Sequence, residues 1–206
     1  MVEPPEIEFD ENEHSYSLDG QRVPALTTVL KEMGCTPGFW FLSQEDLLFY
    51  QSRGSAVHKA VELTLANTLD KRTLAKDVRP YMVGIDRFLN DHPIKVFFAE
   101  KPLIHRAFRY GCRPDIVAEM GRESGVIEVK ATSQHGIATS IQTAGQLVAV
   151  RQEIPNIGKM RIGLRLLQEE PYYDLRRYTE RSDESTWISL LNSYNFLTRH
   201  KLLQRR

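Results

Sequence analysis

Residues 111–132, GCRPDIVAEMGRESGVIEVKAT, decide the fold of this chain. The segments CRPDIVAEM (112–120) and GVIEVKAT (125–132) are short and contain many β-branched residues, which favour extended strands. The stretch that joins them, MGRESG, has the glycines and polar residues typical of a turn. The pattern therefore predicts two adjacent strands of one sheet.

The side chains of this strand pair are expected to divide between a reactive face and a core face. Successive residues of a strand point to opposite faces, so Glu128 and Lys130 share one side, while Ile127 and Val129 face the core. Asp115, on the preceding strand, can meet Glu128 at one point. The alternation thus places two carboxylates and an amine together.

Two neighbouring carboxylates form a ligand set for a hard divalent cation such as Mg²⁺ or Mn²⁺. We expect Asp115 and Glu128 to bind this ion, with the backbone carbonyl of Val129 as a third oxygen ligand. The ion would polarise a phosphate and lower the pKa of a bound water, while Lys130 would orient or deprotonate that water. These residues predict the hydrolysis of a phosphodiester bond.

The sequence around this strand pair alternates between extended and helical patterns. Strands are predicted over residues 94–101 and 103–110, then a helix over 137–152, then strands over 160–167 and 172–179. A helix between strands of one sheet implies a crossover connection. The expected class is α/β of the mixed α+β type, with a central mixed β-sheet flanked by helices.

The N-terminal region is expected to be mainly helical after an initial β-hairpin. Asp19-Gly20 lies between two short extended runs, which is typical of a tight hairpin turn. Ser43 and Ser55 both resemble helix starts, and we expect a helix from Ser55. The helices predicted outside the sheet region cover residues 25–33, 55–67, 79–90 and 183–203.

The length of 206 residues fits one domain. We expect it to comprise an N-terminal hairpin with helices (1–92), a catalytic sheet core (93–180) and a C-terminal helix (181–206). That last helix is expected to pack on the core. Its basic end leaves two alternatives open, namely binding of DNA and association between subunits.

Charge and cysteine content exclude several classes of protein. The 27 basic and 27 acidic residues cancel, so any attraction for nucleic acid must come from local groups such as Arg106, Arg109 and Arg113. Two cysteines are too few for an iron–sulfur cluster with four thiolate ligands. The sequence has no apolar run long enough to cross a membrane and no secretory signal, so we expect a cytoplasmic protein without a membrane partner.

Pro114-Asp115, twelve further residues and then Glu128-Val129-Lys130 resemble the signature of the PD-(D/E)XK nuclease superfamily. Residues 54–62, GSAVHKAVE, are similar to the "G..vH...E" helix of its RecB-like and phage (lambda-type) exonuclease branch. The resemblance implies a restriction-endonuclease-like core with an N-terminal helical region and one or two Mg²⁺ or Mn²⁺ ions. It also implies that His58 is a metal ligand.

Other residues match this branch more loosely. Gln142 corresponds to the glutamine of a "Q…Y" helix, and Gln146 stands where the family has tyrosine. The resemblance implies that Gln142 belongs to the active site and that Gln146 contacts the phosphate or a water. Glu100 matches a glutamate that precedes the "G..D" strand, and Glu62 is a further candidate for the site.

Besides Gln146, four residues are expected to contact DNA. Arg53 and Ser55 lie at the expected start of the His58 helix, and helix N-termini and guanidinium groups both bind phosphate. Thr28 and Lys31 lie in a segment, residues 14–31, that is similar to one near the DNA path in phage and mitochondrial members of the branch. These contacts would position a strand beside the metal.

Together these features predict a metal-dependent DNA exonuclease of phage-type recombination or DNA processing, in the host cytoplasm if it is phage-encoded. The resemblance implies DNA as a partner, along with a single-strand-annealing protein and further copies of the chain. Two alternatives stay open. One is a structure-specific or nicking endonuclease, and the other is a catalytically silent DNA-binding module with the same fold.

Overall fold

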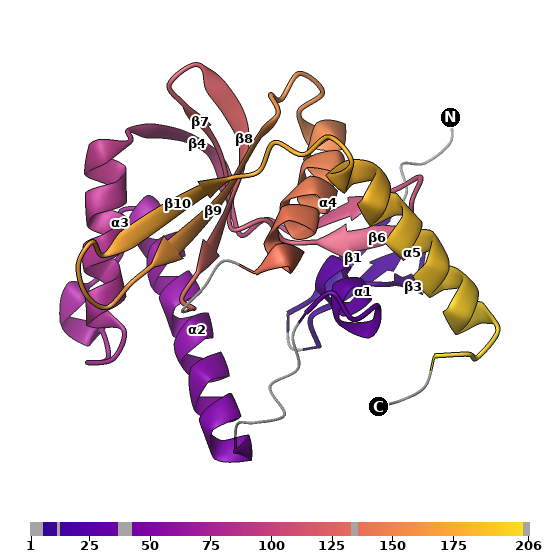
Figure 1. Ribbon diagram of the computed structural model, residues 1–206, viewed down its shortest axis with the longest axis horizontal. Coiled ribbons are helices and arrows are strands. Elements are labelled where there is room, and N and C mark those ends of the chain that lie inside the picture. Colours follow the sequence, from indigo (N-terminus) through magenta and orange to yellow (C-terminus); the bar gives the residue numbers. More distant parts are fainter. Residues whose placement is uncertain (1–5, 12, 37–42, 133–135, 204–206) are drawn as a thin grey trace.

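A five-stranded sheet forms the centre of the computed structural model, which describes residues 6–11, 13–36, 43–132 and 136–203 (Figure 1). Its order is β10-β9-β8-β7-β4, in which β8 and β9 are parallel and the other neighbours are antiparallel. The predicted class, with a central mixed sheet flanked by helices, is confirmed. The strands are β4 (Ile94–Ala99), β7 (Ile116–Met120), β8 (Glu123–Lys130), β9 (Met160–Leu166) and β10 (Tyr173–Arg177).

Helices cover both faces of this sheet (Figure 1). Buried side chains of α2 and α3 pack on one face, and those of α1, α4 and α5 pack on the other. Helix α4 connects β8 to the parallel β9 and is therefore the predicted crossover. No helix in the described ranges is both long and apolar enough to span a membrane. The helices are α1 (Leu26–Glu32), α2 (Gln44–Leu65), α3 (Arg79–Asp91), α4 (Ile137–Glu153) and α5 (Asp183–Arg199), with a 3₁₀ helix at Lys71–Thr73.

Strand β8 divides its side chains between the two faces as its sequence predicts. Ile127 and Val129 are buried in the core beneath α2 and α3, whereas Val126 is buried in the core beneath α4 and α5. Glu128 lies on the α4 side, where it accepts hydrogen bonds from that helix. Because Ile116 pairs with Ile127, Asp115 comes to the level of Glu128.

Helix α4 packs closely on α1 and α5 at Gly145. A Cβ atom added there would lie 2.6 Å from Cδ1 of Leu26 and 3.0 Å from the ring of Trp187. The hydroxyl of Tyr110 also donates to the carbonyl oxygen of Gly145 at 2.6 Å. The missing side chain therefore sets how near α4 comes to these neighbours.

The predicted N-terminal hairpin is confirmed. β2 (Ser15–Leu18) and β3 (Gln21–Val23) pair antiparallel on either side of Asp19 and Gly20. Both turn residues have positive φ, 53° and 69°, as the tight turns that suit a twisted hairpin require. β1 (Ile7–Asp10) pairs with the other edge of β2 and completes a three-stranded sheet.

The strands predicted over 103–110 and 112–120 have the wrong bounds. β5 (Leu103–His105) and β6 (Tyr110–Cys112) pair with each other in a separate small sheet, and a turn lies between them. β7 then begins only at Ile116. Pro114 has no N–H to donate to a neighbouring strand, which accounts for the interruption.

The helix that carries His58 begins at Gln44, so the predicted start at Ser55 is wrong. Ser43 caps the helix by accepting the N–H of Asp46 at 3.0 Å, which makes the earlier of the two start signals the correct one. Ser55 lies within the helix and donates its hydroxyl to the carbonyl oxygen of Gln51 at 3.1 Å. The last helix is also shorter than predicted and ends at Arg199.

Candidate functional site

A cleft of about 950 Å³ lies between helices α2 and α4, where the ends of three central strands meet. It collects side chains from segments that are far apart in the sequence. All four predicted catalytic residues and all predicted metal-binding side chains line it. The residues predicted for the site that line this cleft are Ser55, His58, Glu62, Glu100, Asp115, Glu128, Lys130, Gln142 and Gln146.

Three of these residues form what we call the carboxylate–histidine cluster. His58 Nδ1 lies 3.1 Å from Asp115 Oδ1 and 3.7 Å from Glu100 Oε1. Each residue offers one potential metal-ligating atom, and the three atoms lie within 4.8 Å of one another. Helix α2, the end of β4 and the start of β7 thus converge on one point.

Burial and neighbouring charges alter the acidity of this cluster. Asp115 is only 8% exposed, and burial raises the pKa of its carboxyl group, as does the negative charge of Glu128, while His58 opposes these effects. The carboxylate of Asp115 raises the pKa of His58, an effect that burial only partly offsets. Two acidic groups held this close together favour a positive charge beside them.

Backbone contacts hold the cluster in place. The N–H of Val129 donates to Asp115 Oδ2 at 2.6 Å, so that the adjacent strand β8 fixes this carboxylate. The N–H of Glu100 lies 3.1 Å from the carbonyl oxygen of Pro114 and 3.2 Å from that of Asp115. Glu100 has a φ of 50°, a rare backbone value for a residue with a side chain.

Arg113 anchors Glu100 and was not among the predicted site residues. Its Nε atom lies 2.7 Å from Glu100 Oε2 and also donates to the backbone oxygen of Glu100 at 3.0 Å. Glu100 Oε1 is thereby left facing His58. In the sequence, Arg113 stands out only as one of a group of basic residues. Its role as a partner of Glu100 depends on where β4 ends, which the sequence does not show.

Four other residues form what we call the amide–lysine cluster. Glu128 Oε1 accepts from Lys130 Nζ at 2.7 Å and from Gln142 Nε2 at 2.6 Å. Glu128 Oε2 accepts from Gln146 Nε2 at 2.7 Å. Lys130 also donates to Gln142 Oε1 at 3.2 Å. Both oxygens of Glu128, a residue only 2% exposed, are therefore paired.

The amide–lysine cluster remains charged and has one unused acceptor. Burial would lower the pKa of Lys130, but the negative charges of Glu128 and Asp115 outweigh it and raise that pKa above its usual value. Gln146 Oε1 is buried and has no hydrogen-bond partner among the described residues. An unpaired acceptor in a polar cleft is a natural site for a water molecule or a cation.

The donor set of the carboxylate–histidine cluster fits a divalent cation. Carboxylate oxygens suit Mg²⁺ and Mn²⁺, and imidazole is a common metal ligand. The predicted ligands His58 and Asp115 belong to this set, and Glu100 joins them. Glu128 is not part of this group of three, and its oxygens accept from Lys130, Gln142 and Gln146. The contact that Val129 makes with Asp115 is through its N–H.

The predicted DNA contacts lie in different places. Ser55 lines the cleft, and Thr28 and Lys31 are exposed on α1. The guanidinium of Arg53 lies 5.0 Å from the centre of the Tyr50 ring and 5.5 Å from that of Tyr81. Because Arg53 and Ser55 are in the middle of α2, the proposed phosphate site at a helix N-terminus is wrong for this pair.

The other candidates take the following positions. Glu62 lines the cleft, but its carboxylate pairs with Lys59 at 2.8 Å and does not join either cluster. Gln146 was expected to face phosphate, yet it is 2% exposed and bonded to Glu128. The geometry therefore assigns Gln146 to the support of a carboxylate.

No protein-family model matches this sequence, and no curated protein matches it either. Among solved structures, one described as "Crystal structure of SSO0001" is similar at 14% sequence identity. The similarity covers 84% of this chain and 84% of the other, with a TM-score of 0.37. A TM-score this low does not indicate a shared fold.

Proposed function

We propose that this protein is a metal-dependent deoxyribonuclease of the PD-(D/E)XK type that acts as an exonuclease. The observation that carries the proposal is the position of the carboxylate–histidine cluster beside the amide–lysine cluster in one cleft. Hydrolysis of a phosphodiester requires a cation to stabilise charge on the phosphate and a nearby group to orient water. The two clusters offer these functions separately.

His58, Glu100 and Asp115 would hold the cation. When bound, it would supply Lewis-acid polarisation of a phosphate oxygen and lower the pKa of water at the site. Val129 fixes the orientation of Asp115 through its N–H, and Arg113 fixes that of Glu100. These contacts hold the ligands in position before substrate arrives, which reduces the reorganisation that binding requires.

Lys130 would act on the substrate directly. An ammonium group has three donors, of which two are directed to Glu128 Oε1 and Gln142 Oε1. No hydrogen bond within the described part of the chain uses the third, which would serve a phosphate oxygen or the attacking water. Lys130 would therefore stabilise negative charge as it develops on the phosphate, while Gln142 and Glu128 keep its Nζ atom in place.

The exonuclease part of the proposal is supported by the sequence resemblance, through residues 54–62 and Gln142. A comparison of linear duplex DNA with a covalently closed circle tests it. With Mg²⁺ or Mn²⁺ present, we expect the purified protein to degrade the linear DNA progressively from its ends and to leave the circle intact. Excess EDTA should abolish the reaction.

A Lys130→Ala preparation, purified in the same way, controls for contaminating nucleases, since only activity lost with this substitution belongs to the protein. Cleavage of the circle would show that the protein is an endonuclease and that the exonuclease proposal is wrong. If the protein binds DNA but cleaves neither substrate with either metal, the nuclease proposal is wrong and the chain is a DNA-binding module.

A further inference from the structure

A second cavity, of about 690 Å³, adjoins the cleft. His14 and Ala25 line both, so the two hollows share a border. The second cavity lies between β2 and β3, helix α1 and the C-terminal half of α5, which passes close to them in Figure 1. We call it the arginine groove, after Arg22, Arg109 and Arg199, which line it.

The arginine groove differs from the cleft in charge. No aspartate or glutamate is among its described lining residues. Among the described residues that line the cleft, in contrast, are the carboxylates of Glu11, Glu62, Glu100, Asp115 and Glu128. In a chain whose formal charge is zero, three arginines with no carboxylate among the described residues that line their cavity form a distinct positive region.

The three guanidinium groups are also not neutralised elsewhere. Within residues 6–11, 13–36, 43–132 and 136–203, none of them forms an ion pair. Arg109 donates to the neutral side-chain oxygen of Gln21 at 3.0 Å. Many other arginines of this protein do pair with acids, for example Arg151 with Glu184 and Arg161 with Asp183, both at 2.7 Å.

Polar groups that bind phosphate without reading base sequence complete the lining. Thr28 lies on α1, and Asn195 and Thr198 lie on α5. Hydroxyl, amide and guanidinium groups are among those that contact the phosphates and sugars of DNA, and such contacts position the strand. The guanidinium fork matches two phosphate oxygens at once.

We propose that the arginine groove binds the sugar–phosphate backbone of a DNA strand whose reacting phosphate lies in the cleft. The shared border lets one strand occupy both hollows without crossing the protein. This inference rests on the proposed nuclease function and adds to it the path of the strand. It also selects Thr28, rather than Lys31, as the α1 residue beside the backbone, because only Thr28 lines the groove.

The test measures DNA binding by fluorescence anisotropy in EDTA, where no cleavage occurs. The probe is a short fluorescein-labelled single-stranded DNA. The variant Arg22→Ala/Arg109→Ala/Arg199→Ala is expected to lose about tenfold or more in affinity at physiological salt. The slope of log affinity against log salt should fall by about 2, since each lost phosphate contact removes about 0.7 for single strands.

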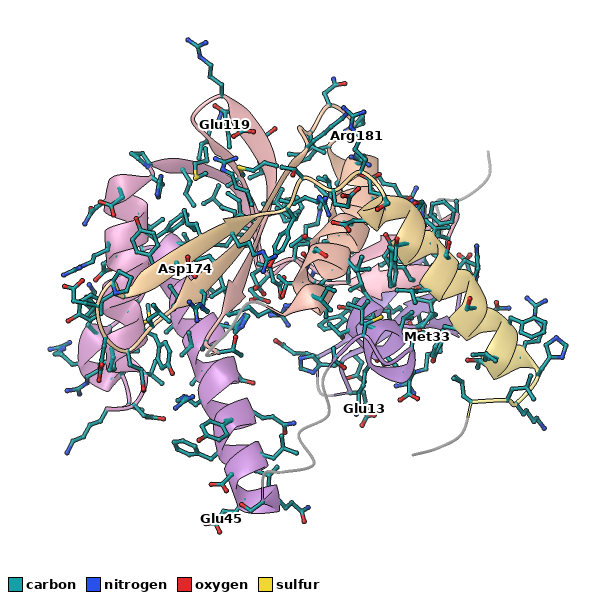
Figure 2. All side chains as sticks on the ribbon, viewed as in Figure 1. Glu13, Met33, Glu45, Glu119, Asp174 and Arg181 are labelled. Atoms are coloured by element: carbon teal, nitrogen blue, oxygen red, sulfur yellow. The ribbon has the colours of Figure 1, made fainter. Side chains whose placement is uncertain are left out.

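A charge-matched control removes three exposed cations elsewhere, as Lys76→Ala/Arg122→Ala/Arg181→Ala. Figure 2 shows Arg181 near the N-terminal end of α5, away from Met33 and α1. This control should bind DNA almost as the native protein does. An equal loss in both triple variants would mean general charge attraction and would overturn the groove. A third variant, Arg22→Lys/Arg109→Lys/Arg199→Lys, keeps the three charges and should retain most of the salt slope, so the test also works if the alanine variant folds poorly.

Hydrolysis separates the groove from the nuclease proposal. Bis(p-nitrophenyl) phosphate is too small to reach from the cleft into the groove, so its turnover should be the same in the native protein and the groove variant. If the groove binds DNA but the protein cleaves none, the nuclease proposal is wrong and the groove proposal is still supported. If the protein cleaves DNA but the alanine variant binds DNA as tightly as the native protein, the groove proposal is wrong and the nuclease proposal is still supported.

Discussion

The two clusters of the cleft differ in how far their polar atoms are paired. In the amide–lysine cluster, both oxygens of the buried Glu128 accept hydrogen bonds from protein donors. In the carboxylate–histidine cluster, one oxygen of Asp115 and one of Glu100 instead approach the same nitrogen of His58. Glu128 is therefore paired with several donors from β8 and α4, whereas Asp115 and Glu100 bring two carboxylates to one imidazole, an arrangement that a cation would stabilise.

This difference suggests that Asp115 and Glu128 have separate roles, one in binding the cation and the other in holding Lys130. Sequence alone assigns Asp115 and Glu128 to one metal ion, because they are neighbours on paired strands. The hydrogen bonds divide them, since Asp115 faces His58 and Glu128 faces Lys130. Substitutions in one cluster should therefore affect metal binding, and those in the other should affect the chemical step.

The largest effect is expected from Asp115→Asn. The amide replaces the central ligand of the carboxylate–histidine cluster, so Mn²⁺ should no longer raise the melting temperature and DNA cleavage should fall more than about 10³-fold. Glu119→Gln is the matched control, because Glu119 is an exposed carboxylate on β7, the strand that Asp115 directly precedes (Figure 2). Cleavage within a factor of two of the native rate by Asp115→Asn would exclude Asp115 as a ligand.

Lys130→Ala should come next, with a loss of about 10²–10³-fold in kcat, the range for removal of one oriented donor from a transition state. The rise in melting temperature with Mn²⁺ should persist, because Lys130 belongs to the amide–lysine cluster. Lys95→Ala, at an exposed position on β4, serves as control. Loss of the Mn²⁺ effect together with activity would show that the clusters are not separable.

Glu100→Gln should have a smaller and conditional effect. With His58 and Asp115 still present, we expect Mn²⁺ to bind about 10–100-fold more weakly, as measured by isothermal titration calorimetry. Cleavage should recover when the Mn²⁺ concentration is raised, unlike cleavage by Lys130→Ala. Native Mn²⁺ affinity in this variant would remove Glu100 from the ligand set.

Gln146→Leu should have the smallest effect on cleavage, about tenfold or less, since it contacts Glu128 and not the proposed metal ligands. Its main effect should be on stability, because the substitution leaves Glu128 Oε2 buried without its donor. Such a loss costs about 1–3 kcal/mol, which urea unfolding can measure. Gln168→Leu, on an exposed loop, provides the comparison, and equal stability of the two variants would contradict the pairing.

The sequence predicts the parts of the site that depend on local patterns. Alternation along β8 correctly separates Glu128 from Ile127 and Val129, and the short connection to β7 brings Asp115 opposite. Helical spacing likewise places Gln142 and Gln146 on one face of α4. These features involve neighbours in the chain or a single turn, so composition and periodicity are enough to find them.

The sequence does not predict what depends on packing between distant segments. Glu100 is placed by backbone hydrogen bonds to Pro114 and Asp115 and by the side chain of Arg113. A serine after a glycine suggests a helix start at Ser55, but a serine inside a helix can satisfy its hydroxyl through the preceding turn. Only the whole structure decides which of these local options is used.

The close packing at Gly145 means that the chemistry of the cleft can be adjusted from outside it. Gly145→Ala would press against Cδ1 of Leu26 and the ring of Trp187, and any shift of α4 that relieves these contacts would move Gln142 and Gln146 with the helix. A displacement of about 1 Å at a catalytic group can cost about 10²-fold in rate. In protein engineering, substitutions at positions 145 and 26 would therefore change the position of α4 without altering a residue of the cleft's two clusters. Leu26→Ala would remove the closer of the two contacts, at 2.6 Å, and leave the one with Trp187 at 3.0 Å, so the double variant should recover part of the lost rate.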